Sequence, residues 1–170
     1  TFRWKSITEK TRMRATYHNH SDRSDGHASI SDIVSFAQTQ DIDELGFSDH
    51  LCILPSGETS RISIPLGGLN EYVQEIGSFR HLKRPAIRLG IEVDWFQGQG
   101  DVIRNAMESF PFDFRIGAVH YVQENEIDKN SRYWKSKTQH ERDRVYRFYW
   151  NLVRDMSESS LFDIVAHLDL

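Results

Sequence analysis

Histidine side chains are concentrated near the start of the chain, in a pattern that suits metal binding. Three of the eight histidines lie within residues 17–27. His18 and His20 are separated by one residue, and on an extended strand this spacing points both side chains to the same face. Two imidazoles at one level make a poor core but a good pair of metal ligands. The spacing therefore predicts a strand and a metal site together.

Four further candidate ligands lie at or near the ends of apolar runs that indicate strands. They are His50, Glu92, His120 and His167. The carboxyl ends of parallel strands meet at one rim, which is where α/β proteins place their active sites. Five separate segments would then deliver imidazole or carboxylate groups to one place. Ligands of these types without thiolate favour Zn, Fe, Mn, Co or Ni over Ca or Mg alone.

Two other histidines and the single cysteine are assigned ordinary structural roles. His81 and His140 lie in polar, helical surroundings and are expected on the surface. Cys52 follows His50 closely, but a small apolar filler is the simpler interpretation. The sequence contains no serine- or cysteine-centred nucleophile motif, so metal chemistry is the main candidate.

Short apolar runs alternate with amphipathic stretches along the chain. Strands are predicted at residues 15–20, 45–48, 86–93, 114–120 and 162–167, and helices at 29–37, 69–79, 102–107 and 145–156, with a polar loop over 123–138. The alternation favours a parallel sheet with crossover helices, as a barrel or a doubly wound sheet. Closing a barrel takes roughly seven or eight strands, so this chain should form most of a barrel without its last segments.

The composition is that of one globular domain spanning residues 1–170. Hydrophobic residues make up 38% and charged residues 27% of the chain, and the formal net charge is -4. An acidic balance disfavours nucleic acid as a partner, and no apolar stretch is long enough to span a membrane. A single cysteine allows no intrachain disulfide and fits a cytoplasmic location. The oligomeric state stays open.

Several motifs occur in an order that points to a family. They are His18-Asn19-His20, Ser24-Asp25-Gly26-His27, Ser48-Asp49-His50, Gly90-Ile91-Glu92-Val93-Asp94, Gly117-Ala118-Val119-His120 and Ala166-His167-Leu168-Asp169. This ordered set, spread over nearly the whole chain, resembles the polymerase and histidinol phosphatase (PHP) superfamily of metallophosphoesterases. Residues 110–120 and 161–170 look most like the monofunctional histidinol-phosphate phosphatase branch.

The resemblance implies an α/β fold, a distorted (β/α)7 TIM-like barrel, with two or three divalent ions such as Zn, Mn or Fe at its carboxyl rim. By motif, one ion would be held by His18, His20, Glu92 and His167. Glu92 would bridge to a second ion that His120 also binds, and His50 would belong to a third site. Either Asp25 or His27 would supply a further ligand, with Asp25 slightly preferred. The family's late Asp-x-His pair does not occur before the chain ends.

The implied reaction is hydrolysis of a small phosphate monoester, L-histidinol phosphate, to L-histidinol and phosphate in histidine biosynthesis. Glu92, His120 and His167 would act at the reacting centre, and Arg23 would contact the phosphate. Asp49 and Asp169 adjoin ligand histidines and could orient an imidazole. The alternatives are a PHP-type nuclease, a protein tyrosine phosphatase, or a degenerate barrel that serves only as a binding or structural module.

Overall fold

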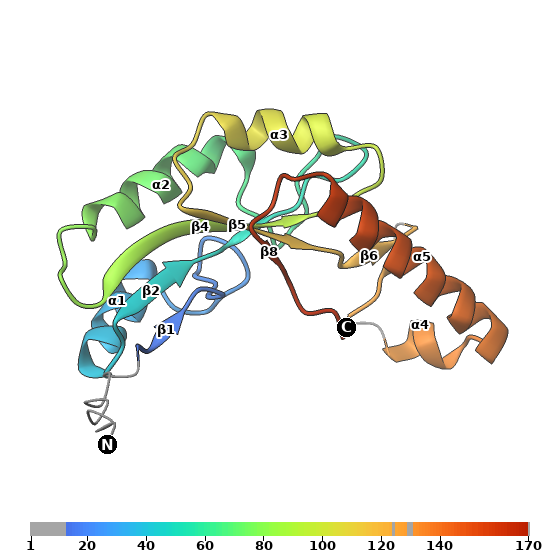
Figure 1. The fold of residues 1–170 in the computed structure, drawn as a ribbon, viewed down its shortest axis with the longest axis horizontal. Coiled ribbons are helices and arrows are strands. Elements are labelled where there is room, and N and C mark those ends of the chain that lie inside the picture. The colour runs from blue at the N-terminus through green and yellow to red at the C-terminus, as the bar shows by residue number, and fades with distance from the viewer. Residues whose placement is uncertain (1–12, 124, 129–130, 170) are drawn as a thin grey trace, which may run out of the picture.

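The computed structural model describes residues 13–123, 125–128 and 131–169, which form a curled parallel sheet with helices around it (Figure 1). The strands run in the order β1-β2-β4-β5-β8, and β3 also pairs with β4. They are β1 (Ala15–Thr16), β2 (Glu44–Phe47), β3 (His50–Leu51), β4 (Ala86–Asp94), β5 (Phe114–Ala118) and β8 (Ile164–Val165). All pairs in this sheet are parallel, as predicted. The sheet has the form of a half-barrel, and a closed barrel of seven strands stays a prediction.

Strands β2 and β3 are two parts of one strand position. Glu44 of β2 pairs with Ala86, and His50 of β3 pairs with Glu92, so both strands keep the same offset along β4. Between them, the Glu92 amide donates a hydrogen bond to the Asp49 carbonyl at 3.1 Å. The described residues therefore build five strand positions, and the sequence predicted five.

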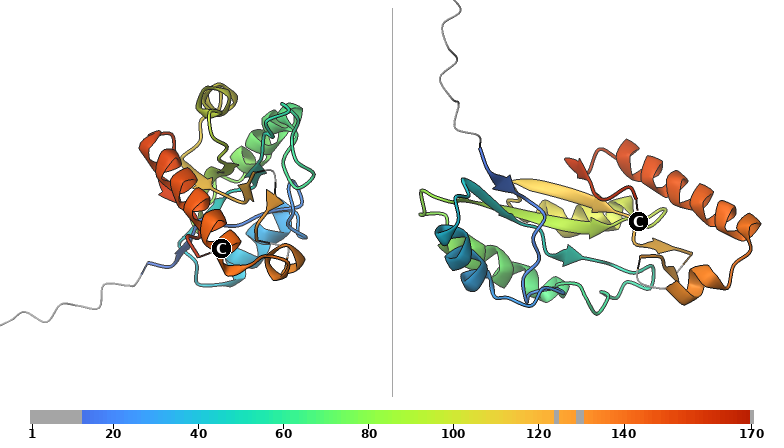
Figure 2. Two further views of the ribbon diagram at one scale, coloured as in Figure 1. Left: turned by 90° about the vertical axis from the view of Figure 1, so that its right-hand side faces the viewer. Right: turned by 90° about the horizontal axis from the view of Figure 1, so that it is seen from below.

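The two faces of the sheet have different partners, because side chains alternate along each strand. The helices α1 (Ile30–Thr39), α2 (Leu69–Ser78), α3 (Gly100–Glu108) and α5 (Gln139–Glu158) form an arc around the outer face (Figure 2). Leu89, Ile91 and Val93 of β4 belong to the core between sheet and helices. The inner face carries a smaller apolar cluster of Phe114, Ile116, Ala118 and Ala166, with Tyr17 packed against it. The alternate residues of β4, which include Glu92, therefore face the barrel interior.

Two glycines let an aromatic ring cross the inner face of the sheet. A Cβ atom at Gly90 would lie 2.2 Å from the Phe114 ring, and one at Gly46 would lie 2.8 Å from it. No side chain is accommodated at such distances while Phe114 keeps its place. The ring also meets Tyr17 edge-on, at a centroid distance of 5.5 Å. The Phe114 ring of β5 therefore packs closely across β2 and β4 at the level of Gly90, two residues before Glu92.

Helices α1 and α5 each begin with a side-chain cap. The Ser29 side chain caps α1 by accepting a hydrogen bond from the Asp32 amide. Helix α5 starts with a capping box between Thr138 and Glu141, and a cap of this kind contributes about 1 kcal/mol. Its buried face consists of Val145, Tyr149, Leu152, Val153 and Met156, which span the helix predicted at residues 145–156. No helix of the described residues has the length and apolar character needed to cross a membrane.

The strand predicted at residues 15–20 ends at Thr16, earlier than expected. Beyond that point the chain is held to β2 through Asn19. The Asn19 side-chain amide donates to the Gly46 carbonyl at 2.8 Å, and the Asn19 backbone carbonyl accepts from the Ser48 amide at 2.9 Å. A side chain therefore replaces part of the backbone ladder. The strands predicted at 114–120 and 162–167 also shorten, to β5 and β8.

The polar loop predicted over residues 123–138 contains regular structure, so this prediction was wrong. Strand β7 (Asn125–Glu126) pairs antiparallel with β6 (Tyr121–Val122), and helix α4 (Ser131–Lys135) follows. Elements this short and polar have no hydrophobic periodicity that a sequence pattern could reveal. Tertiary contacts hold them instead: the Trp134 ring N–H donates to the Ile127 carbonyl at 2.8 Å.

Candidate metal centre

The Glu92 carboxylate lies at the centre of a ring of imidazoles at the carboxyl rim of the sheet. Its side chain is fully buried. Four histidine nitrogens approach its oxygens, namely His18 Nε2 at 3.0 Å, His20 Nε2 at 2.9 Å, His50 Nδ1 at 3.3 Å and His167 Nε2 at 3.1 Å. A fifth, His120 Nε2, lies 3.8 Å away. The structure thus brings together the strand-end residues that the sequence singled out.

Three overlapping groups of described side chains have ligand atoms close enough to share an ion. They are His18 with Glu92 and His167, His20 with His50 and Glu92, and His50 with Asp94 and His120. Within each group the ligand atoms lie within 4.8 Å of one another. Imidazole and carboxylate donors suit ions such as Zn, Mn or Fe. Because Glu92 and His50 each belong to two groups, the arrangement suits more than one ion.

Two nitrogens that face the carboxylate are poorly satisfied by the protein itself. Among the described residues, His20 Nε2 and His50 Nδ1 are buried without a hydrogen bond. Both lie within 3.3 Å of a Glu92 oxygen, but in an orientation that makes no such bond. An unpaired buried polar atom costs about 1–3 kcal/mol. Lone pairs aimed at a shared centre are what a divalent ion would use, so the donor set fits a metal.

The charge states around Glu92 follow from one buried anion among several imidazoles. Burial by itself would raise the pKa of Glu92, but contacts with His167, His18 and His20 outweigh burial and hold that pKa well below its usual range. Burial likewise opposes a charged His20, yet its contacts with Glu92 and Asp25 raise its pKa to about 9. Glu92 is therefore ionised, and the proton on His20 lies where a bound cation would stand.

Asp94 orients His120 and is a functional candidate that the sequence analysis missed. The Asp94 carboxylate is buried, and its Oδ1 lies 2.8 Å from Nδ1 of His120. A carboxylate in this place fixes the ring and leaves Nε2 for a metal. Although burial opposes the charged ring, Asp94 raises the pKa of His120. The signal was present in the sequence, because Asp94 stands two residues after Glu92 on one strand and so shares its face.

The structure places the two alternative ligands near residue 25 very differently. Asp25 Oδ1 lies 2.8 Å from His20 Nδ1 and 3.6 Å from His50 Nε2. Its carboxylate therefore lies beside two of the imidazoles that surround Glu92. His27 is exposed and belongs to none of the ligand groups found among the described residues. A Cβ atom at Gly26 would lie 2.3 Å from the His20 carbonyl oxygen, so the turn that returns Asp25 to His20 depends on glycine.

Asp49 has a different role from the one suggested by its place before His50. Its buried carboxylate accepts hydrogen bonds from the Ser21 amide at 2.7 Å and the Ser24 hydroxyl at 2.6 Å. Burial raises the pKa of Asp49, and these donors oppose that shift. A one-residue step along a strand turns a side chain to the other face. Asp49 therefore holds the turn that carries Asp25.

Arg23, predicted to contact phosphate, is engaged by helix α2. Its Nε donates to Glu75 at 2.8 Å and its Nη1 to Glu71 at 3.3 Å. The Glu75 contact comes first among the causes that raise the pKa of Arg23. Its role toward a phosphate stays a prediction, since a ligand would have to compete with two carboxylates.

The residues assigned structural roles lie where those roles require. His81 and His140 are exposed. Cys52 is fully buried, burial raises the pKa of its thiol, and no ligand group among the described residues includes it. Asp169 is exposed at the end of the described chain, and its contact with an imidazole stays a prediction.

The half-barrel and its candidate ligands suit a metal-binding α/β protein, and comparison with known proteins places the chain in a family. The sequence profile of the PHP domain matches residues 16–170. The chain therefore belongs to the PHP domain family, as its ordered motifs indicated.

Individual relatives point to one branch of this family. A protein of Deinococcus radiodurans named probable histidinol-phosphatase is 31% identical over 128 residues, which are 74% of this chain and 48% of that protein. The crystal structure of histidinol phosphate phosphatase from Lactococcus lactis, complexed with Zn, L-histidinol and phosphate, matches with a TM-score of 0.74 and 25% identity, covering 92% of this chain and 58% of that one. A Listeria monocytogenes structure has a TM-score of 0.73 at 18% identity over 89% of this chain and 64% of its own, a likeness of fold alone. The chain spans about half the length of the relative it matches in sequence.

Proposed function

We propose that this protein is a metal-dependent phosphatase that hydrolyses L-histidinol phosphate to L-histidinol and phosphate. The observation that carries the proposal is the ring around Glu92, where four histidine nitrogens lie within 3.3 Å of one buried carboxylate. Such a ring is costly as a core feature and useful as a metal site. The reaction would belong to histidine biosynthesis, and a cytoplasmic location stays a prediction.

Each residue of the site has a proposed part in holding the ions. His18, His20 and His167 would hold an ion together with Glu92, and His50, His120 and Asp25 would hold the neighbouring ions. Two or three divalent ions would supply Lewis acidity, which activates water and offsets the charge of the phosphate. Asp94 would keep the His120 ring in place through its Nδ1 hydrogen bond of 2.8 Å.

The substrate assignment is supported by the relatives rather than by the ring itself. The Lactococcus lactis enzyme was crystallised with Zn, L-histidinol and phosphate, and it matches 92% of this chain. The Deinococcus radiodurans protein carries the same activity in its name. Both are longer than this chain, so the substrate is proposed for the whole protein.

The test is phosphate release from L-histidinol phosphate by the full-length protein with added Mn or Zn. Parallel reactions use phosphotyrosine, single-stranded DNA and a chelator-treated sample. Turnover that the chelator abolishes, well above that on the other two substrates, is the expected result. If the metal-loaded protein prefers phosphotyrosine or DNA, it is a PHP-type protein tyrosine phosphatase or nuclease instead. Protein that binds no metal would be a barrel without catalysis.

A further inference from the structure

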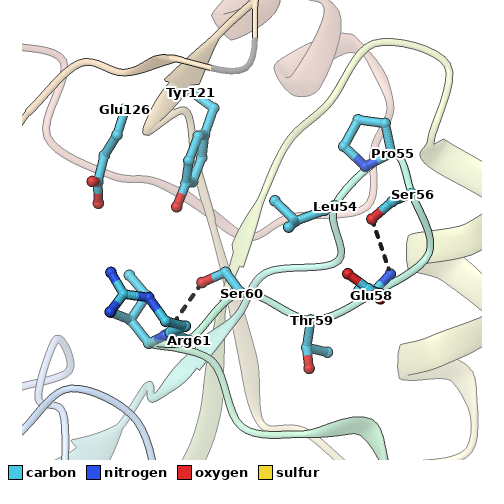
Figure 3. Close-up of a pocket in the computed structure, with 10 residues that line it drawn as sticks. Leu54, Pro55, Ser56, Glu58, Thr59, Ser60, Arg61, Tyr121 and Glu126 are labelled. Atoms are coloured by element: carbon cyan, nitrogen blue, oxygen red, sulfur yellow. Dashed lines mark hydrogen bonds between the residues drawn. The ribbon is translucent and has the colours of Figure 1, made fainter.

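Two pockets of the described chain differ in how their polar groups are satisfied. The larger one, about 580 Å³, lies between residues 54–62 and the β6–β7 hairpin (Figure 3). Its loop bonds to itself, since the Ser56 hydroxyl accepts from the Glu58 amide at 3.4 Å (Figure 3). No residue that lines this pocket has a buried side-chain nitrogen or oxygen without a hydrogen bond. This lining therefore leaves no polar group in need of a ligand.

The second pocket, of about 200 Å³, contains two arginines that no carboxylate neutralises. It lies between helix α3 and the connection from α5 to β8, and it is lined by Arg104, Met107, Glu108, Arg115, Ser160 and Leu161. Arginines elsewhere, such as Arg80 and Arg88, pair with acids. Within the part of the chain that the structure describes, Arg104 and Arg115 make no ion pair. The pocket therefore holds two cations without a bound anion.

Arg115 has a buried donor that the protein leaves without an acceptor. Its Nε atom is buried and makes no hydrogen bond among the described residues. Asp163 is engaged by the Arg115 backbone instead, because its carboxylate accepts from the Arg115 amide at 2.8 Å. A buried N–H without an acceptor is unfavourable, and more so on a charged group. An anion in the pocket would supply the missing acceptor.

The sheet itself separates this pocket from the candidate metal centre. Phe114 and Ile116 of β5 belong to the inner-face cluster. Arg115 stands between them, so its side chain points to the outer, helix-covered face. Glu92 pairs with Ile116 in the register of the sheet but faces the interior. The arginine pocket is therefore a different site from the ring of imidazoles.

The size and the donors of the pocket suit a small oxyanion. Its volume of about 200 Å³ is below the roughly 300–1,000 Å³ of pockets that enclose drug-sized ligands. Guanidinium groups match the oxygens of phosphate and carboxylate through paired hydrogen bonds. Met107 and Leu161 are buried beside the arginines. Such apolar surroundings strengthen the attraction between opposite charges.

Glu108 adds a selectivity that two arginines alone would not give. An ionised carboxylate can only accept hydrogen bonds, so an anion beside it must have a proton to donate. Inorganic phosphate keeps a proton near neutral pH, whereas sulfate has none. A phosphate monoester has mostly lost its last proton, because the pKa of that step is about 6. Of these three anions, inorganic phosphate is thus the one that can bind both the arginines and Glu108.

We propose that this pocket binds inorganic hydrogen phosphate, with Arg104 and Arg115 donating to its oxygens and Glu108 accepting its remaining proton. The site uses no metal ion and does not depend on the proposed phosphatase function. If the protein hydrolyses a phosphate monoester, this pocket takes the phosphate product and disfavours the ester.

The test measures binding of inorganic phosphate to the full-length protein by equilibrium dialysis, in metal-loaded and in chelator-treated samples. The chelator-treated wild type should still bind one phosphate per chain. Arg104→Gln and Arg115→Gln should each weaken this binding about tenfold or more, as the loss of a charged hydrogen bond implies. Arg104 is exposed, so its replacement leaves the core unchanged. The matched control is Arg147→Gln, at an exposed position on α5.

Glu108→Gln tests the selectivity separately. The wild type should bind phosphate at least about tenfold more tightly than sulfate or methyl phosphate. Glu108→Gln should lose most of this preference, because an amide can donate as well as accept. A wild type that binds sulfate as tightly as phosphate would overturn the role of Glu108.

The arginine variants decide whether the pocket is a site at all. If the chelator-treated wild type binds no phosphate, or if Arg104→Gln binds it as tightly as the wild type does, the inference is wrong even for an active phosphatase. Metal uptake, measured for every variant, shows that the fold is intact. Phosphate binding that requires both arginines, in a protein that hydrolyses no ester, would contradict the proposed function and support this site.

Discussion

Strand β4 has a charged cluster near each end, and the two clusters balance their charge in different ways. Near the amino end, Glu44 of β2 accepts hydrogen bonds from Tyr17 and Arg88. Near the carboxyl end, every ion pair of Glu92 among the described residues is with a histidine. A guanidinium is a permanent cation, whereas an imidazole carries charge only when it is protonated.

This difference separates a carboxylate that the chain neutralises by itself from one that is suited to an external cation. The Glu44 side chain is 15% exposed and already paired with arginine, while that of Glu92 is fully buried. Two glutamates on neighbouring strands of one sheet can thus have unrelated roles. The surrounding donors decide which of them belongs to a metal centre.

The largest effect is expected for Glu92→Gln. The amide keeps the shape of the carboxylate but loses the charge that two proposed ions would share. Phosphate release should fall by at least about a hundredfold, and bound metal should be largely lost. Elemental analysis and a phosphate assay measure the two effects. Glu44→Gln is the matched control and should keep its metal; full activity and metal content in Glu92→Gln would remove the contrast between the two clusters.

Metal addition should also distinguish Glu92 from Glu44 by its effect on the thermal stability of the protein. An ion that binds only the folded protein stabilises it by about 2.7 kcal/mol when its free concentration is 100 times the dissociation constant. Chelator-treated wild type and Glu44→Gln should both gain thermal stability when Mn or Zn is added. Glu92→Gln should gain much less. Thermal unfolding curves with and without metal measure this gain in stability. An equal gain in all three proteins would show that the ions bind away from Glu92.

An intermediate effect is expected for Asp94→Asn. This change removes the charge that holds His120 by its Nδ1, but it keeps every proposed ligand. Loss of such a supporting carboxylate typically lowers metal affinity about 10–100-fold. Competition with a chromogenic chelator measures the affinity, with Asp101→Asn on the exposed surface of α3 as the control. If both variants bound metal as tightly as the wild type, Asp94 would have no part in positioning His120.

The smallest effect is expected for the stability of Glu44→Gln in the absence of metal. Ion pairs that solvent can reach contribute about 0–1 kcal/mol, so the free energy of unfolding should fall by about 1 kcal/mol or less. Arg88 and then Tyr17 hold the pKa of Glu44 below its usual value.

A carboxyl group with a lowered pKa stabilises the fold fully above its pKa in the unfolded chain, roughly 4.3. That stabilisation is lost as the pH falls through the lower pKa of the folded state. The difference between wild type and Glu44→Gln should therefore be greatest near pH 7 and shrink at acidic pH. Denaturant unfolding of the chelator-treated proteins at both pH values measures it. A difference that does not change with pH would show that Glu44 contributes through packing instead of charge.

Much of the fold was predictable because its signals are local and periodic. The buried face of α5 follows from residues spaced along one helix, and the cap at Ser29 depends on a residue three positions away. The β6–β7 hairpin and helix α4 were missed because they are short and polar. Contacts such as the one between Trp134 and the Ile127 carbonyl hold them, and such contacts have no sequence period.

The site divides in the same way. The strand-end positions of His50, Glu92 and His120 marked them as candidates, because parallel strands direct their carboxyl ends to one rim. The hydrogen-bond partners of those residues were harder to predict from the sequence. Asp49 stands next to the candidate ligand His50, yet its carboxylate accepts hydrogen bonds from Ser21 and Ser24.

The sequence by itself determined the parallel sheet, the family and the residues that converge at the rim, because alternation and motif order are written along the chain. Only the tertiary structure decided which carboxylate makes a hydrogen bond with which imidazole. Asp94 meets His120 across 26 residues, and Asp25 reaches His20 through a turn that depends on Gly26. The pocket between residues 54–62 and the β6–β7 hairpin was likewise decided by folding. Such contacts depend on strand register and loop paths, which many distant interactions fix together.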